Sequence, residues 1–187
     1  KVLVINPNTT GAMTTLVTGR LHSRLGAAFE LMGLTAQQGY AVIATPSAFD
    51  AAASAALALL RQAQAQGIAH DAVVLACFGD PGLEALRSGS AAPVVGLAES
   101  AMQQAARRGR TYAIVTAGAA WEGLLTQRLL GWGAGALFTG VQVIEGTGLD
   151  VLKDPDGALP RVVQAMERAR GNGAHTVILG GAVFAGY

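Results

Sequence analysis

The single cysteine of the chain, Cys77, lies where a reactive thiol is expected in an α/β protein. It follows the apolar run Ala72–Ala76, a predicted strand, and precedes Asp80-Pro81, a pair typical of a helix start. Backbone N–H groups at a helix N-terminus favour an anion, so a thiol there can ionise below its reference pKa of about 8.5 and act as a base or nucleophile. An inert thiol is the alternative, because free cysteine is among the most buried residue types. We expect Asp80 to act as a cap rather than as a catalytic acid.

A second group of polar residues follows the first predicted strand. The segment Asn6-Pro7-Asn8-Thr9-Thr10 places side-chain amides, hydroxyls and backbone N–H groups between a strand and a helix. Such a turn can hold a carbonyl or carboxylate oxygen. The same residue types are also the usual ones in turns and caps, and that plainer interpretation stays open.

Two other strand ends carry candidate ligand-binding residues. Phe78 and Gly79 follow Cys77 in a loop whose glycine lets the backbone approach a ligand closely. Thr116 ends an apolar run and could offer a hydroxyl to the same ligand, although a threonine at a strand end is otherwise ordinary.

These candidates are positioned by alternating strands and helices. Apolar runs predict strands at 2–5, 31–36, 72–76, 94–95, 112–116, 141–144 and 177–179. Helical patterns occupy 11–25, 50–66 with Asp50 as the N-cap, 98–108, 121–130 and 160–170. Alternation of this kind predicts an α/β fold with parallel sheets.

The second half of the chain repeats the plan of the first. The strand that ends at Asn6 matches the one that ends at Thr116, and the strand before Cys77 matches the one before Gly181. We therefore expect two pseudo-symmetric α/β halves, at 1–96 and 97–187, the first completed by a further C-terminal segment. Because ligands sit beyond the carboxyl ends of parallel strands, both halves would face one cleft.

Composition narrows the possible functions. The chain has 187 residues, of which 51% are hydrophobic and 13% charged, so it can bury a substantial core. There are 13 Lys+Arg against 12 Asp+Glu and no basic stripe, so a nucleic-acid partner is not expected. No run of 18 apolar residues predicts a membrane span. The single cysteine and an opening directly on a strand favour a cytoplasmic protein without a signal peptide, and the low charge favours a homo-oligomer.

Metal and nucleotide chemistry find no support in the sequence. His22, His70 and His175 are far apart and lack the spacing of metal ligands, so we expect no metal site. No glycine-rich phosphate loop with its lysine occurs, and no Gly-x-Ser-x-Gly elbow of a serine hydrolase.

Taken together, the motifs resemble those of the hydantoin and allantoin racemases in the aspartate/glutamate racemase superfamily. The resemblance rests on three segments, Val4–Thr10, Asp71–Leu83 and Pro93–Gly96, and extends over essentially the whole chain. It implies a cofactor-free enzyme in which two cysteines, one from each half, face opposite sides of a carbon next to a carbonyl. One thiolate removes the proton, the other thiol returns one, and turn amides stabilise the enolate oxygen.

One position departs from the family pattern. The second cysteine motif of the family reads Leu-Gly-Cys-Ala-Gly, whereas this chain has Leu179-Gly180-Gly181-Ala182-Val183. Gly181 has no side chain to carry a proton, so water or another side chain replaces the thiol, or the chemistry is one-sided, or the protein is an altered variant of the family.

The resulting prediction is an isomerase that acts on a hydantoin-like or related small substrate. Cys77 transfers the proton, with Gly181 at the position of the second thiol. The resemblance implies that the substrate contacts Asn6, Pro7, Asn8, Thr9, Phe78, Gly79, Thr116 and Ala182. The alternatives are a cofactor-free decarboxylase or lyase on the same scaffold and a non-catalytic ligand-binding homologue.

Overall fold

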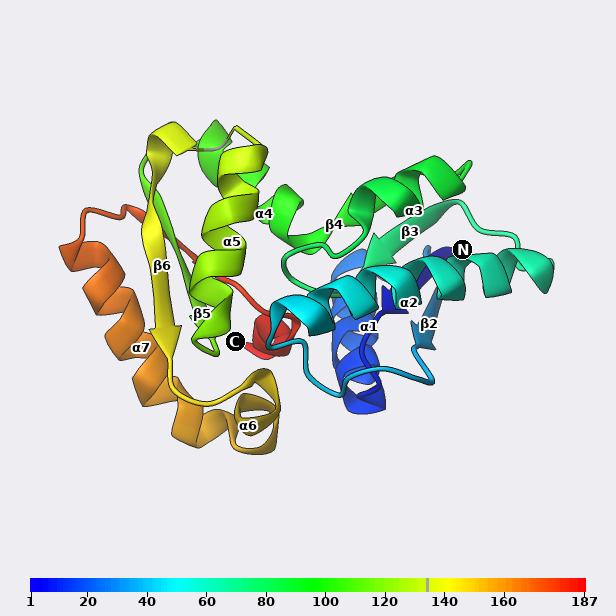
Figure 1. Cartoon of the computed structure of the whole chain (residues 1–187), viewed down its shortest axis with the longest axis horizontal. Coiled ribbons are helices and arrows are strands. Elements are labelled where there is room, and N and C mark those ends of the chain that lie inside the picture. The colour runs from blue at the N-terminus through cyan, green and yellow to red at the C-terminus, as the bar shows by residue number, and fades with distance from the viewer. Residues whose placement is uncertain (134) are drawn as a thin grey trace.

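The chain folds into two parallel sheets flanked by helices, as seen in a computed structural model that describes residues 1–133 and 135–187 (Figure 1). The first sheet has the order β2-β1-β3-β4, with strands β1 (Val2–Asn6), β2 (Leu31–Thr35), β3 (Ala72–Leu75) and β4 (Val94–Gly96). The second has the order β6-β5-β7, with strands β5 (Tyr112–Ala117), β6 (Phe138–Ile144) and β7 (Thr176–Leu179). All neighbouring strands are parallel, which confirms the predicted fold class.

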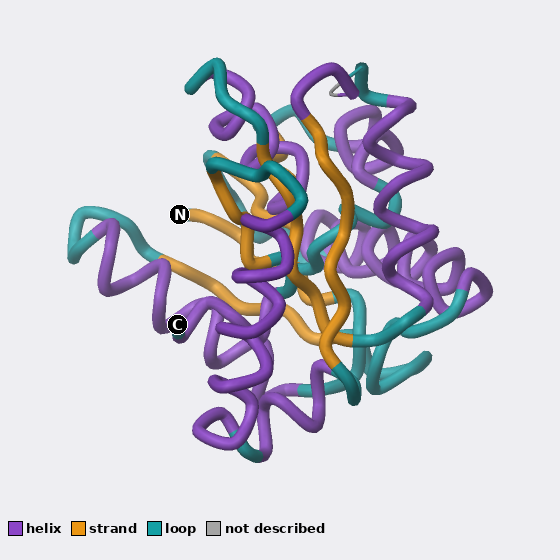
Figure 2. The backbone as a smooth tube through the Cα atoms, turned by 90° about the vertical axis from the view of Figure 1, so that its left-hand side faces the viewer, coloured by secondary structure: helices purple, strands orange, loops and turns teal. Residues whose placement is uncertain are grey.

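Helices connect the strands of each sheet and cover its faces, as the tube in Figure 2 shows. They are α1 (Gly11–Leu25), α2 (Pro46–Ala65), α3 (Leu83–Gly89), α4 (Leu97–Arg107), α5 (Ala120–Gly131), α6 (Gly148–Lys153), α7 (Pro155–Gly171) and the 3₁₀ helices η1 (Gly135–Leu137) and η2 (Ala182–Gly186). Helix α4 links the two sheets, and η2 lies near the middle of the molecule (Figure 1). None of these described helices has the length and apolarity that a membrane span requires.

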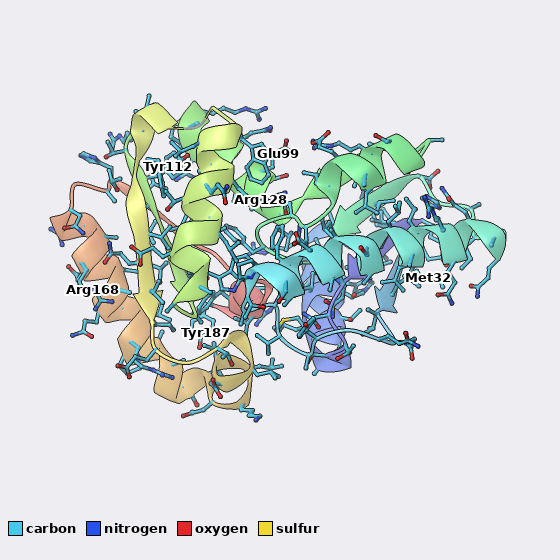
Figure 3. All side chains as sticks on the ribbon, viewed as in Figure 1. Met32, Glu99, Tyr112, Arg128, Arg168 and Tyr187 are labelled. Carbon is cyan, nitrogen blue, oxygen red and sulfur yellow. The ribbon has the colours of Figure 1, made fainter. Side chains whose placement is uncertain are left out.

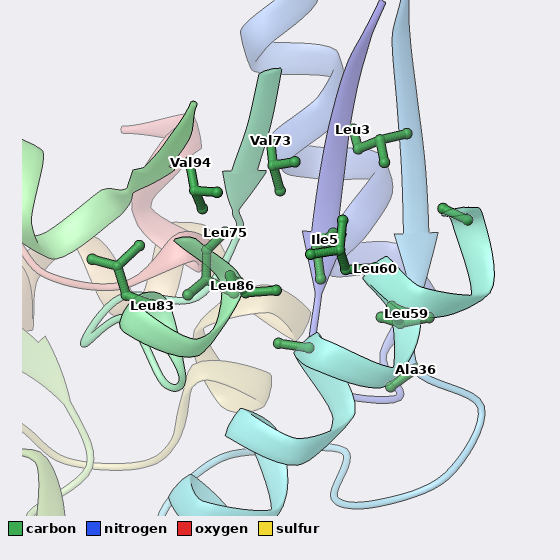
Figure 4. Packing of buried hydrophobic residues seen from close by; sticks show 12 residues of the cluster. Leu3, Ile5, Ala36, Leu59, Leu60, Val73, Leu75, Leu83, Leu86 and Val94 are labelled. Atoms are coloured by element: carbon green, nitrogen blue, oxygen red, sulfur yellow. The ribbon is translucent and has the colours of Figure 1, made fainter. Parts of the chain in front are cut away.

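The central strand β1 illustrates how the sequence forms the core of the first half. All five of its residues are buried, which is typical of a parallel strand covered on both faces. Leu3 and Ile5 pack with Leu60 of α2 (Figure 4), whereas Val4 between them packs with Val17 of α1. The alternation of side chains along a strand thus places one helix on each face of the sheet.

The start of α2 corrects one sequence prediction. Asp50 is not the N-cap, because the helix begins at Pro46, one turn earlier. Thr45 is the N-cap, and its hydroxyl accepts a hydrogen bond from the backbone N–H of Ala48 at 3.1 Å. Threonine followed by proline is the usual pattern of an N-cap and a first helical residue, and the prediction overlooked it.

Asp80 also differs from its prediction as the cap of the helix that follows it. Helix α3 begins only at Leu83, with Gly82 as its N-cap. The Asp80 carboxylate instead accepts hydrogen bonds from the backbone N–H groups of Ala98, at 3.1 Å, and Glu99, at 2.8 Å. It therefore caps α4, which a sequence search limited to the next few residues cannot reveal.

The two sheets share one topology. In each, the first strand lies in the centre, with the second strand on one side and the third on the other. The strands of the first sheet come from residues 2–96 and those of the second from 112–179. The domain boundary between 96 and 97 stays a prediction.

Candidate active site

A cavity of about 80 Å³ opens beyond the carboxyl ends of strands from both sheets. Its walls come from six segments: the turn after β1, the loop between β2 and α2, the loop after β3, the end of β5 with the start of α5, the start of α6, and the turn after β7. The predicted site residues on these walls are Asn8, Cys77, Phe78, Thr116, Gly181 and Ala182. The structure thus brings six of the predicted residues together around one space.

Cys77 and Gly181 occupy equivalent places in the two halves. Each lies two residues beyond the end of its strand, after Leu75 in β3 and after Leu179 in β7. The residue before each donates its backbone N–H to the neighbouring strand in the same way. Ala76 donates to the carbonyl oxygen of Ile5 at 2.8 Å, and Gly180 to that of Val115 at 2.7 Å. Positions 77 and 181 therefore approach the cavity by the same local geometry.

The Cys77 thiol lies in an apolar environment. It is 6% exposed, packs with Ile43 and Phe49, and its Sγ lies 3.7 Å from the carbonyl oxygen of Phe78. Burial raises the pKa of the thiol, and the negative charge of Asp80 raises it further. The positive charge of Arg128 acts in the opposite direction and lowers the pKa. The expected depression of the pKa by a helix start is not found, because α3 begins several residues beyond the thiol.

The turn after β1 is organised by Asn6, whose side chain is fully buried. Its Nδ2 donates to Asn8 Oδ1 at 3.0 Å, to the Thr10 carbonyl at 3.1 Å and to the Thr14 hydroxyl at 3.0 Å. Its Oδ1 accepts from the backbone N–H of Asn8 at 3.1 Å. Asn6 thus shapes the turn and is not among the residues that border the cavity.

The backbone N–H groups of this turn already have acceptors. Thr9 donates to the carbonyl of Tyr40 at 3.1 Å, and Thr10 donates to Asn8 Oδ1 at 2.9 Å. Thr9 and Pro7 do not border the cavity. The resemblance implied that the amides of this turn hold an enolate oxygen. In this structure the backbone N–H groups of Asn8, Thr9 and Thr10 are not free to do so.

Other polar groups on the cavity walls have no partner within the described part of the chain. They include the Thr116 hydroxyl, which belongs to a residue only 3% exposed, and the Asn8 Nδ2. The backbone N–H groups of Phe78 and Ala182, one from each half, likewise lack an acceptor among residues 1–133 and 135–187. These groups can donate hydrogen bonds to a bound oxygen.

Glycines let the two halves approach closely beside the cavity. Gly180 lies so close to Ile114 and Phe78 that a Cβ atom there would overlap both side chains. Phe78, which comes from the first half, is part of the hydrophobic core of the second. Gly79 has a φ of +100° and lies against the ring of Trp121, and does not itself border the cavity. The loop after Cys77 is therefore fixed by packing against the other half.

Several residues of the cavity walls were not predicted from the sequence. They are mostly apolar and include Met13, Val42, Ile43, Trp121, Leu149, Val183 and Phe184. An apolar residue in a loop or helix resembles any other core residue, so the sequence offers no signal that separates the two. No residue on the described walls of the cavity carries a charge. Nor do three metal-binding side chains gather anywhere in the described chain.

The chain is also similar in sequence to known proteins. The family model for Asp/Glu/hydantoin racemase matches residues 2–187. A hydantoin racemase of Rhizobium meliloti is 29% identical over 190 residues, which cover 95% of this chain and 73% of that protein. A hydantoin racemase of Paenarthrobacter aurescens is also 29% identical, with 100% and 79% covered.

Solved structures extend the likeness to the fold. An allantoin racemase from Klebsiella pneumoniae superposes with a TM-score of 0.89 at 30% identity, covering 99% of this chain and 75% of that one. An allantoin racemase from Pseudomonas fluorescens gives 0.91 at 28% identity, with 99% and 78% covered. A variant of arylmalonate decarboxylase gives 0.65 at 18% identity and covers 96% of this chain and 77% of that one, which is a likeness of fold.

Proposed function

Because the chain belongs to the Asp/Glu/hydantoin racemase family, we propose that this racemase-type enzyme acts on a hydantoin-like substrate through Cys77. The observation that carries the proposal is that Cys77 and the equivalent position 181 border one cavity from opposite halves. A substrate between them would present the two faces of a carbon next to a carbonyl. Relatives named hydantoin racemase and allantoin racemase support this substrate class.

The character of the cavity supports an uncharged substrate. Its described walls carry apolar side chains such as Ile43, Trp121 and Leu149 and no charged side chain. A free amino acid would have to bury an ammonium and a carboxylate without partners, which costs several kcal/mol. A hydantoin ring is neutral and can accept hydrogen bonds at its carbonyls, so it fits these walls better.

In the proposed reaction the Cys77 thiolate removes the proton from the carbon next to the carbonyl. The electron pair moves onto the carbonyl oxygen, and an enolate forms. The backbone N–H groups of Phe78 and Ala182 and the hydroxyl of Thr116 are the donors available to that oxygen. We propose Asn8 Nδ2 as a donor to the second carbonyl of the ring.

The proton that returns to the opposite face needs another source, because Gly181 has no side chain. We propose a water molecule beside Gly181. The hydroxide that it leaves takes the proton of the Cys77 thiol through solvent, which restores both the water and the thiolate. The cavity volume of about 80 Å³ is several times the roughly 10–15 Å³ that one water needs by this measure. Water is a weaker acid than a thiol, so racemisation would be slower than with two cysteines.

Incubation of each enantiomer of a 5-substituted hydantoin, followed by chiral chromatography, tests the proposal. We expect each enantiomer to convert into the other, and Cys77→Ala to convert neither. Full conversion by Cys77→Ala would contradict the assigned role of the thiol.

A one-sided reaction is the second candidate, and Gly181 is the observation that favours it. Decarboxylation of a disubstituted malonate needs one proton donor, which Cys77 alone can supply as carbon dioxide leaves. Carbon dioxide release from such malonates, with no conversion of hydantoins, would favour this candidate. If neither reaction occurs, a ligand-binding homologue without catalysis becomes the favoured interpretation.

A further inference from the structure

Arg128 reaches from the second half to the loop that carries Cys77. It lies on the side of α5 that faces the first half (Figure 3). Its Nη2 donates a hydrogen bond to the backbone carbonyl of Asp80 at 3.1 Å. Its guanidinium also lies 4.7 Å from the ring centre of Phe49 and 5.4 Å from that of Trp132. These contacts hold the cation in one place, because both rings attract positive charge.

This placement is costly for an arginine. Its Nε is buried without a partner among residues 1–133 and 135–187, and burial lowers the pKa of the guanidinium. A neutral side chain of similar length would fill the same space between Phe49 and Trp132 without that cost. Packing alone therefore does not account for a positive charge at position 128.

The loop that Arg128 contacts is under strain at Asp80, a residue with a φ of 53° that is fully buried. The backbone N–H of Asp80 donates to the carbonyl of Cys77 at 3.2 Å. Helix α4 holds the carboxylate of Asp80 and Arg128 holds its carbonyl. Helices α4 and α5 thus both fix the position of Cys77 through their contacts with Asp80.

The charges that act on Cys77 come from the same two residues. Asp80 raises the pKa of the thiol, and Arg128 lowers it. The charge of Glu99 raises the pKa of Asp80 and is not among the charges that act on the thiol. The carboxylate of Glu99 is itself paired with Arg87. In the described chain, Arg128 is therefore the cation that offsets the negative charge near the thiolate.

We infer that Arg128 is a positioning residue for Cys77, which fixes the loop of the thiol through Asp80 and supplies the positive charge that stabilises the thiolate. The inference rests on the proposed function in that it assumes a catalytic thiolate. Removing the charge should leave a thiol in place that ionises less readily. The conservative change to lysine should preserve the effect, whereas a neutral side chain should not.

The test measures the rate at which iodoacetamide alkylates Cys77 between pH 7 and 10, with Cys77→Ala as the blank. We expect Arg128→Met and Arg128→Gln to react about tenfold more slowly at each pH, because an opposite charge nearby favours the thiolate. Arg128→Lys keeps the positive charge on a side chain of similar length, and should react within about threefold of the unaltered protein.

Arg168→Met is the matched control. Arg168 also donates its Nη2 to a backbone carbonyl, that of Val143 at 3.2 Å, but it lies on α7, well apart from Arg128 (Figure 3). Thermal unfolding by circular dichroism shows which variants fold. If the folded neutral variants react at the unaltered rate, or if Arg128→Lys is as slow as they are, the inference is wrong.

This readout does not depend on turnover. Slow alkylation of the neutral variants, with no activity of the unaltered protein on hydantoins, would overturn the proposed function but would still show that Arg128 promotes ionisation of the Cys77 thiol. If the protein is active, the neutral variants should lower kcat more than they raise KM. A change in KM alone would contradict a role in ionising the thiol.

Discussion

At the residue scale, the proposed chemistry centres on a thiol that is hard to ionise. Burial raises the pKa of Cys77, so only a small fraction is thiolate near neutral pH. The Cys77 thiolate is therefore a strong base, but only a small fraction of the molecules carry it. The position of the thiol on the cavity wall followed from its motif, whereas its burial did not, because burial depends on Ile43 and Phe49, which are distant in sequence.

Activity that requires this thiolate should rise with pH. While the pH stays below the raised pKa, each pH unit increases the thiolate fraction about tenfold, and kcat/KM should follow. Initial rates of racemisation from pH 6 to 9 check this, with stability monitored at each pH. A flat profile over that range would mean that Cys77 is not the base.

Replacing Cys77 should remove most of the catalysis. Proton transfer by a positioned side chain contributes about 10²–10⁴-fold, so Cys77→Ala should lower kcat/KM by at least about 100-fold. Cys77→Ser is the closest control in size. Its hydroxyl is a far weaker acid, so it too should be inactive at pH 8.

A second thiol can be introduced at Gly181. Its φ of 170° is extended backbone that any residue adopts, and an added Cβ would lie 3.1 Å from the ring of Phe184, which must shift slightly. If water serves as the second proton source, Gly181→Cys should raise the racemisation rate about tenfold or more, because a thiol is the better donor. Gly181→Ala introduces the same Cβ without the thiol and should bring no gain.

At the element scale, the loop after β3 joins the two halves. Asp80 caps α4, Phe78 enters the core of the second half, and Arg128 returns from α5 to the same loop. The sequence predicts the order of strands and helices well because each element carries its own pattern. The sequence does not predict these contacts between the loop and the second half, because Asp80 and its partners Ala98 and Glu99 share no short motif.

The buried Asp80 carboxylate should make stability depend on pH. Burial raises its pKa to about 6, against about 3.9 in an unfolded chain. The folded state holds the proton more tightly, so the stability that this group contributes is greatest below about pH 4 and is lost as the pH rises through 6. The lost free energy of unfolding is on the order of 3 kcal/mol.

Asp80→Asn isolates this effect, because asparagine does not titrate. From urea unfolding at pH 4, 5, 6 and 7, we expect the unaltered protein to lose stability relative to the variant as the pH rises. A constant difference between the two proteins across this range would show that Asp80 keeps an ordinary pKa.

Close contact between the halves should make Gly180→Ala lower the free energy of unfolding. A Cβ there would overlap Ile114 and Phe78, and overpacking of this kind costs about 1–3 kcal/mol. Gly19 in α1 has open space around it, so Gly19→Ala should stabilise the protein by about 0.5–1 kcal/mol through helix propensity. Equal effects of the two substitutions on thermal unfolding would contradict the described packing.

At the scale of the whole molecule, two similar sheets present their carboxyl ends to one cavity. The repeat in the sequence predicted this meeting, because equivalent strand ends carry the candidate residues in both halves. The apolar walls were not predictable, since residues such as Leu149 on α6 resemble ordinary core residues. The homo-oligomer and the cytoplasmic location stay predictions, and analytical ultracentrifugation checks the first.

The central claim is that Cys77 works on one face of a carbon whose other face is served by water beside Gly181. Its most direct test is hydrogen exchange in heavy water, with each enantiomer of a 5-substituted hydantoin and of allantoin. Mass spectrometry follows the label and chiral chromatography follows the configuration. We expect label uptake with inversion for both enantiomers. For the enantiomer whose hydrogen faces Cys77, uptake should be faster than inversion, because the thiol exchanges its proton with heavy water and returns a deuteron to the same face more readily than water protonates the other. No uptake above the Cys77→Ala control would contradict the account.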